Sequence, residues 1–140
     1  DRALTIVTNS LPIATMLSVR GSLEVQLVGG RVRGRTLATV DNSALEYLRT
    51  VYVDVAFLGM NGFSIERGLT TPDSAEAAVK SALIRCSRRA VLLADHTKFG
   101  VDHFAHVADL ADIDTVVTDS LLSDQAVTDL EAAGPKVVRA

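Results

Sequence analysis

The sequence has little of several features that mark particular protein classes. It contains one cysteine, Cys86, so it has no disulfide framework, and a reducing compartment is expected. No apolar run approaches the roughly 20 residues that span a bilayer, and no signal peptide opens the chain. We therefore expect a cytoplasmic protein that does not enter a membrane.

Common catalytic and nucleotide-binding signatures are also missing. The sequence contains neither a Gly-x-Ser-x-Gly nucleophile elbow nor a Walker phosphate loop. His96, His103 and His106 do not form a compact metal-binding pattern, so no metal and no cofactor are expected. The net charge of −3 disfavours a general nucleic-acid-binding surface on these residues.

What remains is the composition of a globular domain. The 140 residues are 48% hydrophobic and 22% charged, which suits one domain with a substantial core. The chain shows no internal repeat, low-complexity tract or interdomain linker. It begins with Asp1, three residues before an apolar segment, and this abrupt start predicts a fragment of a longer protein.

Residues 68–100 carry the clearest local pattern. Thr71-Pro72-Asp73 predicts a helix start, because it offers a capping side chain and a proline tolerated in the first turn. The following apolar residues recur at helical spacing and predict one buried face: Ala75, Ala78, Val79, Ala82, Leu83 and Cys86. Residues 90–94 are then apolar without alternation, as in a parallel strand covered on both faces.

The end of this strand is the best candidate site. Asp95 is the first charged residue after the apolar run, and Lys98 follows in a loop closed by Gly100. Ligands bind outside the carboxyl ends of strands in open parallel sheets. Glu76 and Lys80 lie at i, i+4 on the edge of the helix's apolar face, so their charges could meet the same rim.

The rest of the chain alternates predicted strands and helices. Strands are expected at residues 4–8, 23–28, 53–58, 114–119 and 136–138. Helices are expected at 11–19, 39–49 and 123–133, with a basic loop at 31–35 and a glycine-containing loop at 59–62. Residues 101–113 match no single element, although four apolar side chains should anchor them: Phe104, Val107, Leu110 and Ile113. This alternation predicts an α/β fold with a mostly parallel sheet covered by helices.

Six sequence blocks together resemble the effector-sensing domain of DeoR-family bacterial transcription repressors. They are TNSLPIA (8–14), LVGGRVR (27–33), AFLGMNG (56–62), GLTTPDSAEAAVK (68–80), LLADHTKFG (92–100) and IDTVVTD (113–119). The resemblance implies a three-layer, Rossmann-like fold similar to ribose-5-phosphate isomerase A and the CoA-transferases. It also implies a homo-oligomeric (dimeric or tetrameric) cytoplasmic regulator whose operator binding responds to a phosphorylated sugar or related metabolite.

The sequence departs from the family pattern near its beginning. The family carries an N-terminal winged helix-turn-helix that binds operator DNA, and no such segment occurs here. The family's Asp-x-Gly-Thr-Thr phosphate loop, expected just upstream of Leu4, is also missing. We therefore expect residues 1–140 to be the sensor domain without its DNA-binding part, its phosphate loop and its first strand.

Comparison with ribose-5-phosphate isomerase A indicates which residues of the isomerase pocket this sequence keeps and which it lacks. The resemblance places Glu76 nearest the isomerase's catalytic glutamate, and Asp95 and Lys98 match an aspartate and a lysine of its Asp-Glu-Ser-Lys loop. Its acidic Asp-Gly-Ala-Asp-Glu loop corresponds to residues 59–63, which contain no acid. Sugar isomerisation needs a base and partners for the enediolate, so this loss predicts binding without turnover. An aldose–ketose sugar-phosphate isomerase is the alternative, and an oligomerisation module with a vestigial cleft is a third possibility.

The expected effector-binding residues are Asn9, Ser10, Gly59, Asn61, Gly62, Glu76, Asp95 and Lys98. Most have an equally simple structural role. Asn9 and Ser10 suit a helix cap, and Asp95 can brace its own loop. Glu76 can form a surface ion pair with Lys80, worth about 0.2–0.5 kcal/mol.

Overall fold

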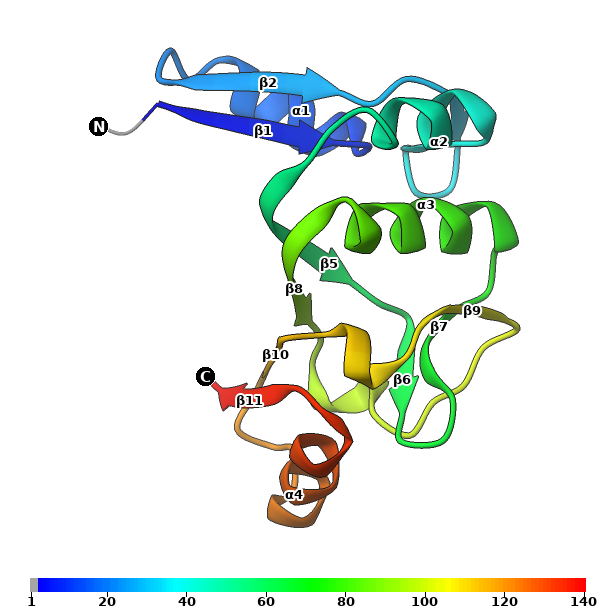
Figure 1. Cartoon of the computed structure of the whole chain (residues 1–140), viewed down its shortest axis with the longest axis vertical. Helices are drawn as coiled ribbons and strands as arrows, with labels where there is room; N and C mark the ends of the chain where they lie inside the picture. The colour runs from blue at the N-terminus through cyan, green and yellow to red at the C-terminus, as the bar shows by residue number, and fades with distance from the viewer. Residues whose placement is uncertain (1–2) are drawn as a thin grey trace. The chain divides into compact units, whose positions relative to one another are not determined.

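The computed structural model describes residues 3–140 (Figure 1). The chain divides into two compact units, Asp1–Val51 and Tyr52–Ala140. No helix within the described residues is long and apolar enough to cross a membrane.

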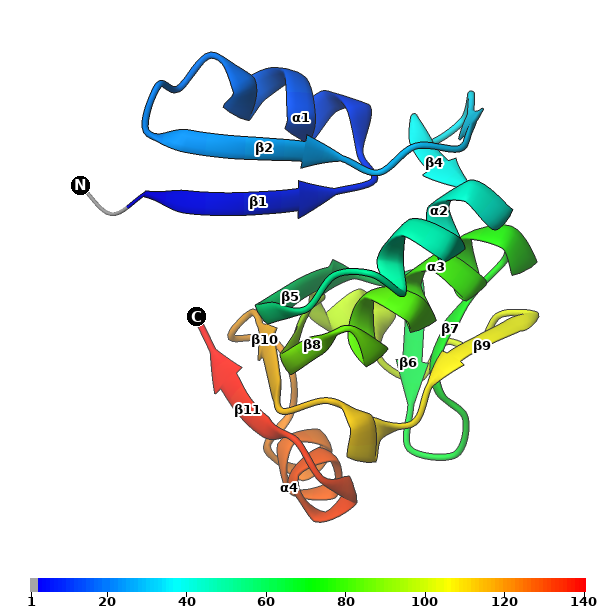
Figure 2. The ribbon, with the colours of Figure 1, turned by 45° about the horizontal axis from the view of Figure 1, so that its top comes forward.

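The first unit combines two small sheets with two helices. The strands β1 (Leu4–Thr8) and β2 (Leu23–Leu27) are parallel and joined through α1 (Leu11–Ser18), which packs against β2 (Figure 2). Next comes an antiparallel pair, followed by a short helix: β3 (Arg31–Arg33), β4 (Ala38–Val40) and α2 (Asn42–Leu48). The expected basic loop at 31–35 therefore begins as a strand, and the helix expected from residue 39 starts only after β4.

The second unit is built on a four-stranded parallel sheet with the strand order β11-β10-β8-β5. The strands are β5 (Val53–Gly59), β8 (Ser87–Leu93), β10 (Thr115–Thr118) and β11 (Lys136–Arg139). The helix α3 (Ser74–Arg85) connects β5 to β8 through two further strands, and α4 (Asp124–Ala133) connects β10 to β11. These elements confirm the predicted α/β class with a mostly parallel sheet.

The helix starts follow from local capping. Asp73 accepts the backbone N–H of Glu76 at 2.9 Å and begins α3, as the sequence predicts. Ser123 does the same for α4 by accepting the N–H of Ala126 at 3.2 Å. In the first unit, Ser10 caps α1 through the N–H of Ile13.

A second, antiparallel sheet with the order β6-β7-β9 lies in the same unit. Its strands are β6 (Gly62–Ser64), β7 (Gly68–Thr71) and β9 (Ala105–Ala108), and short 3-10 turns cover His96–Lys98 (η1) and Leu110–Asp112 (η2). These three strands were not predicted. Among the four anchors expected in 101–113, Val107, Leu110 and Ile113 are buried, whereas Phe104 is 84% exposed and anchors nothing.

The core of the second unit lies on one face of the parallel sheet. Alternate residues of the strands enter it together with residues of α3, α4 and the antiparallel sheet: Ala56, Leu58, Ala90, Leu92, Val116, Ala77, Leu130, Phe63 and Leu69. A fully buried leucine such as Leu92 contributes about 1.5–3 kcal/mol through burial of apolar surface. The opposite face is open at Phe57, Leu93 and Val138, which are 67%, 45% and 38% exposed. The prediction that the β8 strand is covered on both faces is therefore wrong at its end.

Candidate functional site

The carboxyl ends of the parallel strands gather polar residues at one edge of the second unit. Gly59 ends β5 and pairs with Leu93, the last residue of β8, while Val117 of β10 pairs with Leu93 from the other side. Asp95 follows β8 by two residues, and Asp119 directly follows β10. This is the edge at which open α/β sheets bind ligands.

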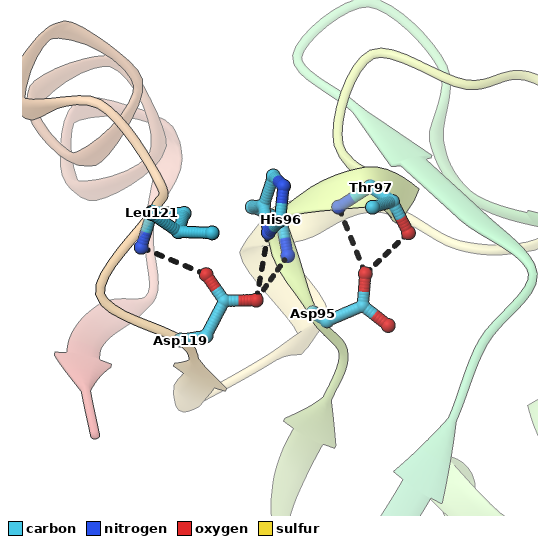
Figure 3. A network of polar contacts seen from close by, with 5 residues as sticks. All are labelled: Asp95, His96, Thr97, Asp119 and Leu121. Atoms are coloured by element: carbon cyan, nitrogen blue, oxygen red, sulfur yellow. Dashed lines mark hydrogen bonds and ion pairs between the residues drawn. The ribbon is translucent and has the colours of Figure 1, made fainter.

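Asp119 holds the loop after β8 in place (Figure 3). One oxygen of its carboxylate accepts the backbone N–H of His96 at 3.0 Å and lies 2.8 Å from Nδ1 of the same residue. The other oxygen accepts the N–H of Leu121 at 2.8 Å. These bonds favour the charged carboxylate, and those from the His96 side chain and backbone lower the pKa of Asp119 to about 2.

Asp95 braces the turn that contains Lys98. Its Oδ1 accepts the Thr97 hydroxyl and the Thr97 backbone N–H, the latter at 2.8 Å. Both bonds lower the pKa of Asp95, the hydroxyl bond more strongly, and the nearby Lys98 charge acts in the same direction. Figure 3 shows the second oxygen, Oδ2, pointing away from Thr97. The bracing role considered for Asp95 is thus present, and one oxygen is still available.

Glu76 and Lys80 lie on α3 near the end of β5. The Lys80 ammonium donates a hydrogen bond to the Gly59 carbonyl oxygen at 2.7 Å. Burial lowers the pKa of Lys80, and the negative charge of Glu76 partly opposes that shift. Glu76 itself is only 9% exposed, which is unusual for a carboxylate and does not fit the simple surface ion pair.

The loop after β5 serves packing more than cleft formation. The Thr71 hydroxyl donates to the Asn61 side-chain oxygen at 2.6 Å, which ties the loop to β7. Gly62 packs against the backbone of Val101, so a side chain there has no space. Neither Gly59 nor Gly62 has a positive φ, and of the two only Gly62 lies close to another part of the backbone.

Asn9 and Ser10 lie in the first unit, where both make structural contacts. The Asn9 amide donates to the Thr39 carbonyl oxygen at 3.1 Å, and Ser10 caps α1. The capping role considered for Ser10 is confirmed. In the same unit Arg31 pairs with Asp41 at 2.7 Å.

Asp95, His96 and Asp119 also form a group of possible metal ligands, with donor atoms within 4.8 Å of one another. A divalent cation there would have to compete with the N–H donors on both oxygens of Asp119 and on Oδ1 of Asp95. Sugar hydroxyls and an anionic group, in contrast, can use the atoms that remain open at this edge.

Comparison with known proteins decides which family this architecture represents. The sequence model of the DeoR C terminal sensor domain matches residues 1–120. The chain belongs to the DeoR C-terminal sensor domain family. This membership confirms the sequence prediction of a regulator's sensor domain over that of an isomerase.

Relatives of this DeoR sensor domain are transcription regulators. The chain is 37% identical over 138 residues to the HTH-type transcriptional regulator GlpR of Haloferax volcanii, covering 99% of the chain and 54% of the relative. It is 35% identical to the HTH-type transcriptional repressor GlcR of Bacillus subtilis, covering 90% and 48%. It is 32% identical to the glycerol-3-phosphate regulon repressor of Escherichia coli, covering 84% and 46%. The chain thus spans about half the length of these relatives.

The sequence located the edge but missed two of the polar groups on it. His96 was considered only as a metal ligand and Asp119 only as the end of a strand, whereas Lys80 was expected to meet this rim together with Glu76. The contacts of Asp119 and Lys80 join residues 23 and 21 positions apart, so no local spacing reveals them. The position of Asp119 directly after an apolar strand was the available signal.

Proposed function

We propose that this DeoR sensor domain binds a phosphorylated sugar or related metabolite at the carboxyl edge of its parallel sheet. Through homo-oligomerisation, as a dimer or tetramer, it controls operator binding by the DNA-binding part of a cytoplasmic repressor. The observation that carries this proposal is the set of open polar atoms at that edge. Within residues 3–140, Asp95 Oδ2, His96 Nε2 and the Lys98 ammonium make no hydrogen bond.

These atoms suit a polyol that carries an anionic group. A carboxylate oxygen accepts the hydrogens of sugar hydroxyls, and an imidazole nitrogen accepts or donates according to its protonation. The Lys98 ammonium supplies a charge-assisted hydrogen bond to a phosphate oxygen. The names of relatives agree with this chemistry, since one is a glycerol-3-phosphate regulon repressor.

Regulation also requires that the ligand binds two subunit arrangements with different affinities. A ligand shifts an equilibrium between two subunit arrangements only if it binds one arrangement more tightly than the other. Asp95, His96 and Lys98 lie in one short loop fastened by Asp119, so a ligand held there would act on the orientation of that loop.

Thermal-shift and calorimetric titration test the proposal. The 140-residue chain and the complete gene product are each titrated with glycerol 3-phosphate, ribose 5-phosphate, glucose 6-phosphate and fructose 1-phosphate. We expect at least one to raise the melting temperature, and Lys98→Ala to abolish that rise while Lys136→Ala retains it. Lys136 starts β11 at the opposite end of the sheet and is exposed, so it is a matched control. Absence of binding by every sugar phosphate in both proteins, or turnover of ribose 5-phosphate, overturns the proposal.

A further inference from the structure

Lys80 places a second ammonium group at the edge of the sheet, outside the loop that carries Lys98, and the proposed function has not yet assigned it a role. It projects from α3, and its ammonium lies at the last carbonyl of β5. Gly59 pairs with Leu93, so one strand spacing of about 4.8 Å separates this point from the end of β8. Lys80 and the Asp95–Lys98 loop therefore occupy neighbouring positions on the same edge.

Most of the N–H donors of Lys80 make no hydrogen bond to the described residues. An ammonium has three N–H donors. Within residues 3–140 the Gly59 oxygen is the one acceptor that Lys80 contacts, so two donors remain for a ligand. Gly59 is exposed, and water can satisfy its carbonyl if Lys80 turns to another acceptor.

A second cation would offset negative charge at this edge. Asp95 and Asp119 both have lowered pKa values and are ionised at neutral pH. Their negative charges oppose an incoming phosphate, and Lys98 supplies one positive charge beside Asp95. The Lys80 ammonium is partly desolvated and has Glu76 as its charged neighbour, so an anionic ligand would restore interactions that burial has removed.

We propose that Lys80 is an effector-binding residue that donates from the end of β5 to the anionic group of the metabolite. The effector class is accordingly a small polyol phosphate whose phosphate reaches the end of β5 while its hydroxyls face Asp95 and His96. This inference rests on the proposed function, because it assigns a further contact within the same site. It also gives α3 a direct connection to the ligand.

Calorimetric titration of Lys80→Met tests the assignment, with Lys136→Met as the matched control. The ligands are the four sugar phosphates named above and, for each, the sugar or polyol without phosphate. We expect Lys80→Met to weaken phosphate-dependent binding at least about tenfold, the scale of one charge-assisted hydrogen bond, while Lys136→Met binds like the unmodified protein. Lys80→Arg should recover part of the loss, because it restores a cation near the same position.

The possible failures are distinguishable. If the unmodified protein binds no sugar phosphate, the proposed function is at fault. If it binds one and Lys80→Met binds it within about twofold, the proposed function stands and the Lys80 assignment is wrong. Equal weakening of phosphorylated and unphosphorylated ligands also contradicts the assignment, since Lys80 would then act on the shape of the site. Lys80→Met should remain folded because it replaces a half-buried charge with an apolar chain of similar length.

Discussion

Gly62→Ala should destabilise the second unit through one backbone contact. A methyl group at this position would penetrate the Val101 carbonyl oxygen, and it would lie 2.9 Å from the Val101 carbonyl carbon and 3.1 Å from Cδ2 of His103. Ordinary van der Waals contact starts near 3.4 Å, so the 101–103 segment would have to move. This segment is fastened on both sides, by the Gly100 N–H to Phe63 at 2.8 Å and by the His103 N–H to Thr70 at 2.9 Å.

The cost of that movement follows from overpacking. Inserting a methyl group into a closely packed region typically costs about 1–3 kcal/mol, and here backbone hydrogen bonds resist relaxation. For a chain of 140 residues this corresponds to a fall in melting temperature of roughly 3–12 °C. Urea denaturation followed by far-ultraviolet circular dichroism measures the loss directly.

Gly59→Ala is the matched control for this experiment. An added methyl group at Gly59 meets no atom within 4 Å, and its φ lies in the ordinary region. We therefore expect Gly59→Ala to be as stable as the unmodified chain, or more stable by up to about 1 kcal/mol through the reduced entropy of the unfolded chain. Equal stability of the two variants would refute the packing argument at Gly62.

Three further substitutions test local features of the second unit. Asp73→Ala removes the cap of α3 and should cost about 1 kcal/mol by urea denaturation; an unchanged free energy of unfolding contradicts the capping role. Leu92→Ala leaves a cavity in the core and should cost about 2–5 kcal/mol, and a loss below 1 kcal/mol would show that Leu92 is not enclosed. Asp119→Asn should lower stability at neutral pH, because the folded pKa of about 2 lies below the ordinary 3.8. The charged carboxylate therefore stabilises the fold above about pH 4, and the difference between the two proteins should shrink as pH falls from 4 to 2; a constant difference contradicts this.

Local patterns were enough to predict the parallel strands and the starts of α1, α3 and α4, whereas α2 begins later than expected because residues 38–40 form β4. The caps Ser10, Asp73 and Ser123 act within three residues of themselves, so the sequence displays them directly. The antiparallel sheet was missed because its strands are short and its order joins distant segments, such as Leu69 with Ala108. Nothing in residues 62–71 alternates strongly enough to mark a strand.

In the candidate site, too, features set by neighbouring residues could be predicted, whereas contacts between distant residues could not. Asp95 and Lys98 follow an apolar run closely, so their position beyond a strand end could be predicted. The orientation of His96 depends on Asp119, and the position of the Lys80 ammonium depends on a carbonyl of another strand. These contacts depend on how the strands pair in the folded sheet, so they could not be read from the sequence.

The most direct test of the account locates the ligand on the protein. Backbone amide chemical shifts are recorded by nuclear magnetic resonance while glycerol 3-phosphate, and then the other three sugar phosphates, are added to the isotope-labelled chain and to the complete gene product. We predict the largest changes at residues 59–61, 95–98 and 119–121, with Lys136 and its neighbours unaffected. Changes centred on the amino ends of the strands, or no change with any of the four ligands, would contradict it.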